Sequence, residues 1–292
     1  MPTVRGFLWC LLWISVWRTA GAAAEVRFHT VVGTESEMRV VEGKDMVSGL
    51  AWGFYDDRIA TNGWGYLKVE SNPKVDPALQ MTAAGFLEGS LTQIRIEQQV
   101  FNEYFTQFPN GTRSKDGKYL YSGRLVTFFD QNIAWMWSEI AAHPSDQYWV
   151  QVKLVLAQVE GMLRGYNSAV KNGSYPLRFV DLFFLNSNGD VGDILEMLER
   201  RRSSRSPAAN GNALATEEPV AQQRSPFNWE SASYKDVFER LTMSSRCTAL
   251  VKLLPDDLYV GHTTWGHYTT MLRIYKVSIG ATMVTVDWCF WH

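Results

Sequence analysis

The sequence predicts an α+β fold, because stretches with the spacing of strands and stretches with the spacing of helices follow one another in separate blocks. Two long helical patterns lie between a strand pair near the N-terminus and a second strand pair near the C-terminus. The 292 residues are 46% hydrophobic and 13% aromatic, which supplies enough apolar surface for a substantial core. This composition excludes a largely disordered chain.

Residues 1–24 have the pattern of a secretory signal peptide. Arg5 is followed by an apolar run at 6–16, and small residues at 20–24 offer a cleavage site. An uncleaved membrane anchor is the alternative, but the run is much shorter than the roughly 20 residues that span a bilayer. We therefore expect the segment to be removed during export.

Three blocks of the N-terminal half show the periodicity of regular structure. Aromatic and β-branched residues at 48–69 surround Asn62-Gly63, which predicts two strands joined by a tight turn. Residues 81–105 space their apolar side chains by about 3.6 residues, as in one helix. Residues 131–166 are also helical in pattern, and His143-Pro144 predicts a break inside this stretch.

The middle of the chain combines a short apolar run with a long polar segment. Residues 179–185 (FVDLFFL) predict a buried strand, closed by a turn at 186–190. Residues 199–225 are rich in Ser, Ala and Gln and poor in large apolar residues, which is typical of an exposed, cleavable linker. A short amphipathic helix is expected at 228–243.

A second hairpin is predicted at 247–265, where two apolar runs flank a Pro-Asp-Asp turn. Such a turn pairs Cys247 with Thr264 or Trp265. His262 then lies on the facing strand, at the roughly 7–8 Å spacing of a diagonal neighbour. The predicted hairpin therefore brings a thiol and an imidazole close together.

Charge and cysteine content exclude two further classes of protein. The chain has 28 Lys and Arg against 30 Asp and Glu, a net charge of −2, which argues against electrostatic capture of nucleic acid. Three cysteines are too few for a disulfide scaffold. Signal removal would leave Cys247 and Cys289, either paired or with Cys247 free for chemistry. Asn110 and Asn172 begin N-glycosylation sequons, which agree with export.

Several short motifs fail to define a binding site. His262 and His267 are five residues apart, a spacing that suits neither one strand face nor one helix face for a shared metal. Residues 186–193 resemble a calcium loop, but Val191 occupies the position where that loop requires glycine. The sequence has no phosphate-binding glycine loop and no G-x-S-x-G elbow. We therefore expect no metal and no cofactor.

Cys247 has the placement of a self-activating nucleophile, because it begins a predicted strand after a cleavable segment. Its sulfur could attack the carbonyl of Arg246, and hydrolysis of the resulting thioester would leave Cys247 as a new N-terminus. The freed α-amino group, with a reference pKa of about 7.7–8, could then act as general base for the thiol. Spacing alone favours the plainer alternative, a small buried hydrophobic residue at the start of a core strand.

A set of segments carries a family likeness: GFLEG at 85–89, DLFFLN at 181–186, CTALVKLLP at 247–255, DLYVGHTTW at 257–265 and YTTMLRI at 268–274. Around Cys247 these segments give cysteine, proline turn, histidine and tryptophan in that order. Over about residues 45–276, the sequence resembles the phospholipase B-like family of the N-terminal nucleophile hydrolases.

The resemblance implies an αββα sandwich, incomplete in this chain, in a secreted or lysosomal glycoprotein that is cut into two associated fragments. Cys247 would be the nucleophile, and His262 and Trp265 would line the site. The substrate would be an acyl ester of a phospholipid or related lipid, or an amide, while homodimer formation stays open. The implied parts are a signal peptide at 1–24, an N-terminal fragment at 25–198, a linker at 199–246 with cleavage between Arg246 and Cys247, the start of the nucleophile-bearing fragment at 247–276 and a divergent tail at 277–292.

Residues 277–292 show no likeness to the family and end in an aromatic cluster. Family members continue well beyond Ile274, with most of the second sheet, an oxyanion-stabilising asparagine and an active-site arginine, whereas this sequence stops at His292. We expect an alternative exon, a retained intron or a faulty gene model here. The alternative to a hydrolase is therefore a non-catalytic luminal or secreted glycoprotein, or an inactive truncated isoform.

Overall fold

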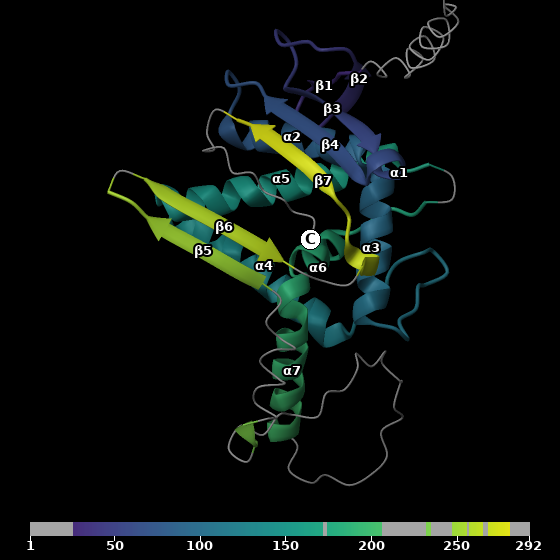
Figure 1. Ribbon diagram of the computed structural model, residues 1–292, viewed down its shortest axis with the longest axis vertical. Helices are drawn as coiled ribbons and strands as arrows, with labels where there is room; N and C mark the ends of the chain where they lie inside the picture. Colours follow the sequence, from purple (N-terminus) through teal and green to yellow (C-terminus); the bar gives the residue numbers. More distant parts are fainter. Residues whose placement is uncertain are drawn as a thin grey trace, which may run out of the picture.

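The computed structural model combines a five-stranded mixed sheet, a group of helices against one face of that sheet, and a separate two-stranded hairpin (Figure 1). This arrangement confirms the predicted α+β class. The signal peptide, most of the predicted linker, Asn172 and Cys289 lie outside the described residues. The structure describes residues 26–171, 174–205, 232–234, 247–255, 257–264 and 268–280.

The sheet joins the two ends of the described chain. Its strand order is β2-β1-β3-β4-β7, and neighbouring strands are antiparallel except β4 and β7, which are parallel. A parallel neighbour requires a long crossover connection, and here the crossover contains helices α2 to α7 and the hairpin. The strands are β1 (His29–Gly33), β2 (Met38–Glu42), β3 (Ala51–Arg58), β4 (Trp64–Ser71) and β7 (Ile274–Ile279).

The predicted N-terminal hairpin is confirmed, since β3 and β4 pair along their whole length. A single helical turn, α1 (Ile59–Asn62), connects them and ends at Gly63. The φ of 83° at Gly63 is a left-handed conformation that glycine adopts without strain. The side-chain oxygen of Asn62 accepts a hydrogen bond from the Trp64 N–H at 3.0 Å, which closes the turn.

The helical region confirms one predicted break and adds another. The stretch predicted at 131–166 is divided at His143-Pro144, as expected. The stretch predicted as one helix at 81–105 is divided at Thr92, whose hydroxyl donates to the Glu88 carbonyl oxygen at 2.7 Å, a contact that commonly bends helices. The helices are α2 (Pro77–Leu91), α3 (Gln93–Gln107), α4 (Gly123–Ala142) and α5 (Gln147–Ala169).

Helices α2 and α5 pack closely because both have glycines where they cross. Gly85 and Gly89 on α2 are four residues apart, as are Gly161 and Gly165 on α5, so each pair shares one face of its helix. A β-carbon at any of these positions would overlap a backbone carbonyl oxygen of the facing helix. The four glycines therefore set the distance between the two helices.

The strand predicted at 179–185 is wrong, since these residues belong to helix α6 (Phe179–Asn186). A short apolar run fits a buried strand and a buried helix equally well. Here Asp181 favours the helix, because its carboxylate accepts hydrogen bonds from the Arg178 backbone N–H at 2.7 Å and from the Arg178 guanidinium. These contacts satisfy a free donor at the start of the helix and fix its first turn.

Helix α7 (Asn188–Arg205) occupies a stretch predicted as turn and linker. Ser187 alone separates it from α6, so the turn predicted at 186–190 is largely helical. The helix also continues into the segment predicted as linker from residue 199. The helix predicted at 228–243 lies almost wholly outside the described residues.

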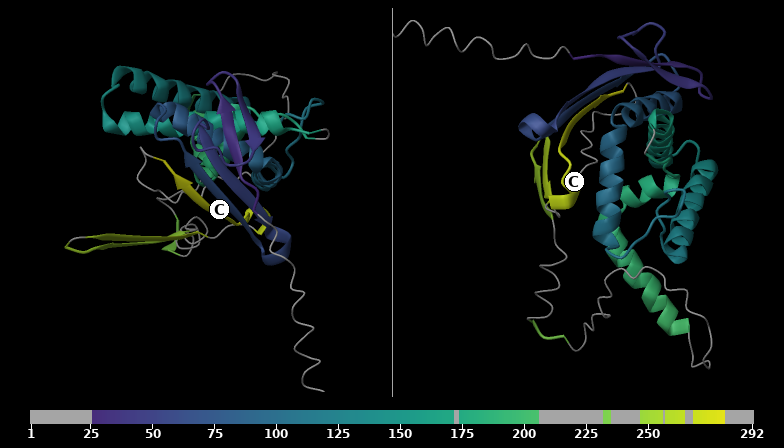
Figure 2. Two further views of the ribbon diagram at one scale, coloured as in Figure 1. Left: turned by 90° about the horizontal axis from the view of Figure 1, so that it is seen from above. Right: turned by 90° about the vertical axis from the view of Figure 1, so that its right-hand side faces the viewer.

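The main core lies between the sheet and the helices. Helix α2 covers β3 and β4, with α5 behind it, as the right-hand view of Figure 2 shows. In the described part of the chain, no helix is both long enough and apolar enough to span a membrane. The most deeply buried side chains include Val31, Leu67, Leu87, Ile96, Leu125, Tyr166 and Phe184.

The opposite face of the sheet, called here the outer face, carries no helix among the described residues (Figure 2). In the left-hand view of Figure 2 the two-stranded hairpin lies on the side of the sheet away from the helices. The predicted sandwich would have its second sheet on this side. Among the described residues, only the two-stranded hairpin lies there.

Candidate functional site

The hairpin predicted around Cys247 is confirmed. Strands β5 (Cys247–Leu253) and β6 (Leu258–Thr264) form an antiparallel ladder in which Cys247 is opposite Thr264, with His262 two residues earlier on the facing strand. Opposite residues of such a ladder share a face, and residues alternate between faces along each strand. Positions 247 and 262 are therefore diagonal neighbours on one face of the hairpin.

The Cys247 end of the hairpin is the end that joins the rest of the protein (Figure 1). Arg246 and Trp265, which flank the hairpin in sequence, lie outside the described residues. The chain then forms the 3₁₀ turn η2 (Tyr268–Thr270) before it enters β7. The side-chain Nε2 of Gln99 on α3 donates to the last carbonyl oxygen of η2 at 2.7 Å, in a buried position. Helix α3 therefore holds the segment that leads from the hairpin to the sheet.

A buried ion pair fixes β7 against α2. Lys276 Nζ donates to Glu88 Oε2 at 2.6 Å, and the two side chains are 2% and 1% exposed. Glu88 belongs to the GFLEG segment, whose glycines Gly85 and Gly89 face α5. One short segment of α2 thus contacts both the next helix layer and the strand that follows the hairpin. This pair could not be predicted from the sequence, because its members are 188 residues apart.

Around the turn, between Leu250 and Val260, the described side chains of the hairpin are mostly apolar and are exposed on both faces. Neither of its strands pairs with a third strand among the described residues. Free edges and uncovered apolar faces are typical of a sheet that another strand or another chain completes. The side chains more than half accessible to solvent are Leu250, Val251, Leu253, Leu258, Tyr259 and Val260.

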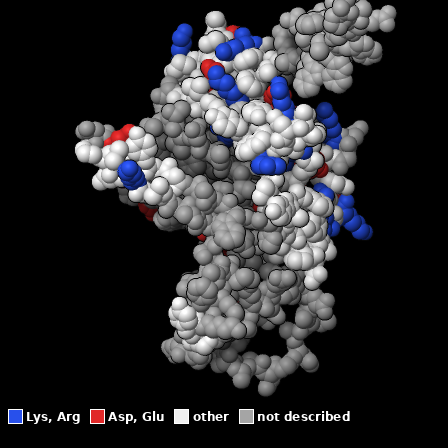
Figure 3. Space-filling view, viewed as in Figure 1, with Lys and Arg blue, Asp and Glu red and all other residues white. Residues whose placement is uncertain are grey.

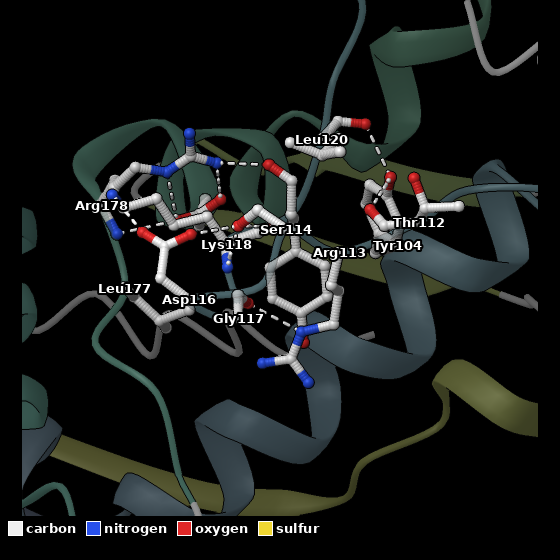
Figure 4. A network of polar contacts seen from close by, with 12 residues as sticks. Tyr104, Thr112, Arg113, Ser114, Asp116, Gly117, Lys118, Leu120, Leu177 and Arg178 are labelled. Atoms are coloured by element: carbon white, nitrogen blue, oxygen red, sulfur yellow. Dashed lines mark hydrogen bonds and ion pairs between the residues drawn. The ribbon is translucent and has the colours of Figure 1, made fainter.

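The exposed Asn110 lies in a loop that a network of polar contacts holds in place (Figure 4). The Tyr104 hydroxyl lies 3.0 Å from the carbonyl oxygen of Thr112, the third residue of the sequon. The same hydroxyl lies 2.6 Å from the carbonyl oxygen of Leu120, on the far side of the loop. The loop therefore presents Asn110 to solvent in a fixed conformation. The second sequon asparagine, Asn172, lies outside the described residues.

Buried aromatic and charged groups support this loop from beneath. Arg178 donates to the Tyr119 carbonyl oxygen at 2.7 Å, and its hydrogen bonds to Asp181 raise the pKa of its guanidinium. Burial raises the pKa of Tyr119 to about 12, and it also raises the pKa of Tyr121. Neither phenol ionises in the physiological range, so these residues are structural rather than acid–base groups.

Charged side chains gather in the upper part of the surface shown in Figure 3, where the sheet lies. One contact there joins Lys68 Nζ and Glu70 Oε1 at 2.8 Å on the outer face of the sheet, with the Lys68 side chain 36% exposed. Burial by itself raises the pKa of Glu70, but hydrogen bonds from Lys68 and Trp52 outweigh it and lower the pKa. This partly exposed pair contrasts with the fully buried pair on the other face.

None of the predicted site residues lines the cavity beside helix α3. A cavity of about 350 Å³ opens beside α3. Among the described residues, no group of three or more His, Cys, Asp or Glu lies close enough together to hold a metal ion. The cavity is lined by Glu97, Gln98, Phe101, Asn102, Arg113 and Tyr119.

The sequence that forms β3 to β7, the helices and the hairpin matches one known protein family. The sequence model of the family described as Phospholipase B matches residues 51–283. The chain belongs to the phospholipase B family. The match continues past β7 into the segment 277–292, for which no likeness to the family was predicted.

Relatives in this family are longer than the present chain. Phospholipase B-like protein C of Dictyostelium discoideum is 31% identical over 245 residues, which cover 83% of this chain and 37% of the relative. Phospholipase-B 81 of Drysdalia coronoides is 26% identical over 279 residues, covering 92% and 45%. Phospholipase B of Crotalus adamanteus is 26% identical over 282 residues, covering 93% and 45%. The chain therefore spans less than half the length of these phospholipase B relatives.

Proposed function

We propose that the chain carries the nucleophile of a phospholipase B-like hydrolase, which cleaves acyl ester bonds of phospholipids or related lipids. Membership of the phospholipase B family supports hydrolase chemistry. The observation that supports the choice of nucleophile is the register of β5 and β6, in which position 262 is a diagonal neighbour of Cys247. An amide bond, which reacts by the same acyl transfer, is the alternative substrate.

Activation requires that Cys247 become an N-terminus. The Cys247 sulfur attacks the carbonyl carbon of Arg246, and the peptide nitrogen takes up a proton and leaves as the α-amino group of Cys247. Water then hydrolyses the thioester, which gives the carboxylate of Arg246 and a free thiol. With a reference pKa of about 7.7–8, the new amino group accepts the thiol proton near neutral pH.

The same residue then acts on the lipid. The thiolate attacks the ester carbonyl, the alcohol leaves with a proton, and water releases the fatty acid from the acyl-enzyme. In this proposal His262 and Trp265 line the site. Position 262 shares a face of the hairpin with Cys247, and Trp265 directly follows Thr264, the residue opposite Cys247, in the sequence.

Cleavage before Cys247 would leave the two fragments associated. Strand β7 pairs with β4 over six residue pairs, from Gly65 opposite Ile274 to Glu70 opposite Ile279. The ion pair between Glu88 and Lys276 also joins the two fragments. These contacts support the proposal that the processed protein consists of two associated fragments.

Replacement of Cys247 by alanine is expected to abolish cleavage, because alanine has no nucleophile. The chain and the variants Cys247→Ala, Cys247→Ser and Cys289→Ala are expressed with the native N-terminus, incubated at acidic pH, and the fragments are sequenced from their N-termini. The wild type and Cys289→Ala should yield a new N-terminus at Cys247. Cys247→Ser should yield one slowly, because a hydroxyl is a weaker nucleophile.

Two results would contradict the proposal. Cleavage at the same bond in Cys247→Ala would assign the cut to an external protease. If the wild-type chain stays intact, the self-processing proposal is wrong. That result would favour the alternative, a non-catalytic secreted or luminal glycoprotein in which the exposed hairpin is a binding element.

We further propose that the protein is a glycoprotein of the secretory pathway, either secreted or held in the lysosomal lumen. The variant Asn110→Gln should lose one N-linked glycan, because the sequon lies in an exposed, ordered loop. The measurement is the gel mobility of protein from secreting cells, before and after treatment with an N-glycosidase. Asn102→Gln, a nearby asparagine outside any sequon, should leave the mobility unchanged. Identical mobility of all three proteins would rule out a glycan at Asn110.

A further inference from the structure

The elbow between α4 and α5 carries exposed aromatic side chains that the proposed reaction does not use. Trp135 is 51% exposed and Tyr148 is 66% exposed, although such large apolar rings are usually buried. Two more rings, His143 and Trp149, contact them or each other. We call these four residues the aromatic cluster.

The rings of the aromatic cluster are arranged around Trp149. The Trp135 centroid lies 5.5 Å and the Tyr148 centroid 5.0 Å from the Trp149 centroid, each with an interplanar angle of 83°. His143 lies nearly parallel to Trp149, at 6.5 Å and 21°. Perpendicular rings form corners at which a bulky cation can contact more than one exposed ring, and aromatic rings are the groups that bind quaternary ammonium ions in other proteins.

The charges around the aromatic cluster favour a cation as well. Residues 131–152, which contain the whole cluster, include no Lys and no Arg, and one cation, Lys153, follows a helical turn after Trp149. Glu139 Oε2 lies 3.4 Å from His143 Nδ1, and the Asp146 carboxylate accepts a hydrogen bond from the Tyr148 backbone N–H at 2.8 Å. An anionic membrane surface attracts polybasic segments, so this acidic rim is unsuited to it.

We propose that the aromatic cluster docks on a membrane surface that presents the choline headgroups of zwitterionic phospholipids. Tryptophan and tyrosine favour the boundary between lipid and water, because each combines an apolar ring with a hydrogen-bonding group. The trimethylammonium group of phosphatidylcholine carries the charge and the size that the ring corners and the acidic rim complement. The docking surface goes beyond the hydrolase function proposed above and does not depend on Cys247.

Trp137 supplies a matched control on the same helix. It is 40% exposed, close to the value for Trp135, but two residues along an α-helix turn its side chain by about 200°. Trp137 makes no ring contact within the described ranges. The variant Trp137→Ala therefore removes a similar apolar area to Trp135→Ala but leaves the aromatic cluster intact.

Binding of the full chain to vesicles tests the proposal. The vesicles contain diether phosphatidylcholine, diether phosphatidylethanolamine or diether phosphatidylglycerol, because ether lipids cannot be cleaved by an acyl hydrolase. Co-sedimentation should show the strongest binding to phosphatidylcholine. Trp135→Ala and Tyr148→Ala should each weaken that binding about fivefold, the effect of losing one cation–π partner. Trp137→Ala should bind like the wild type, and Trp135→Phe should keep part of the binding.

Several outcomes would overturn the proposal. Equal or tighter binding to phosphatidylglycerol would show that the surface does not recognise choline. If Trp137→Ala and Trp135→Ala weaken vesicle binding equally, the binding depends only on exposed apolar area and not on the aromatic cluster. If circular dichroism shows that Trp135→Ala does not fold, the binding of Tyr148→Ala tests the proposal instead. The Tyr148 ring is the most exposed of the cluster, so its loss should disturb the fold least. Cys247→Ala should bind like the wild type, so a failure of the hydrolase proposal leaves this result interpretable.

Discussion

The variant Gly85→Ala is expected to lose about 3 kcal/mol of unfolding free energy, the upper end of the usual cost of overpacking, although alanine is the better helix former by about 1 kcal/mol. The new methyl group would overlap the carbonyl oxygen of Gln158 in the backbone of α5. A backbone atom inside a helix cannot turn aside as a side chain can, so α2 and α5 would have to separate along their contact. Gly161→Ala should behave alike, because its methyl group would meet the Thr82 carbonyl oxygen from the other side.

Gly192→Ala is the matched control for this prediction. Gly192 lies inside α7, and a β-carbon there would meet nothing within 4 Å. This variant should gain up to about 1 kcal/mol from helix propensity alone. Urea denaturation followed by circular dichroism at 222 nm, a standard helix signal, measures all three variants. The explanation fails if Gly85→Ala is as stable as Gly192→Ala.

The variant Lys276→Met is expected to lose about 3–5 kcal/mol of unfolding free energy, because it leaves the Glu88 carboxylate buried without its cation. The double variant Glu88→Leu with Lys276→Met should recover most of this loss, since two apolar side chains need no compensation for a buried charge. Because β7 continues directly from the segment after the hairpin, Lys276→Met should also reduce cleavage before Cys247 if the self-processing proposal holds.

Lys68→Met tests whether burial causes this effect. Lys68 pairs with Glu70 in the same sheet at 2.8 Å but is 36% exposed, so its loss should cost no more than about 1 kcal/mol. Denaturant titration of the two single lysine variants and the Glu88 double variant gives the comparison. Equal losses in Lys276→Met and Lys68→Met would contradict the role assigned to the buried pair.

Local patterns were enough to predict both hairpins and the break at His143-Pro144. Each depends on residues within one turn or one strand pair, which sequence spacing reports directly. The run at 179–185 was predicted wrongly because seven apolar and acidic residues carry no clear period. Only the contact between Asp181 and Arg178 distinguishes a helix start there, and a carboxylate three residues after a possible cap was the signal to weigh.

The candidate site also has one part that the sequence could predict and one part that it could not. The length of one turn predicted that Cys247 would lie opposite Thr264 or Trp265, and the structure places it opposite Thr264. The anchoring of the segment that follows the hairpin could not be predicted, because Gln99 and Thr270 are 171 residues apart and Lys276 looks like an ordinary exposed strand residue in the sequence. The catalytic roles of Cys247, His262 and Trp265 remain proposals that rest on the family.

The parallel pairing of β4 with β7 has a consequence for synthesis of the chain. Glu88 is made 188 residues before Lys276, so at the usual 5–20 residues per second it waits about 10–40 s for its partner. During that interval the edge of β4 and the carboxylate beneath it have no native neighbour. The sheet cannot be completed before β7 is synthesised, so the edge of β4 stays open for longer than it would in a sheet built from local strand pairs.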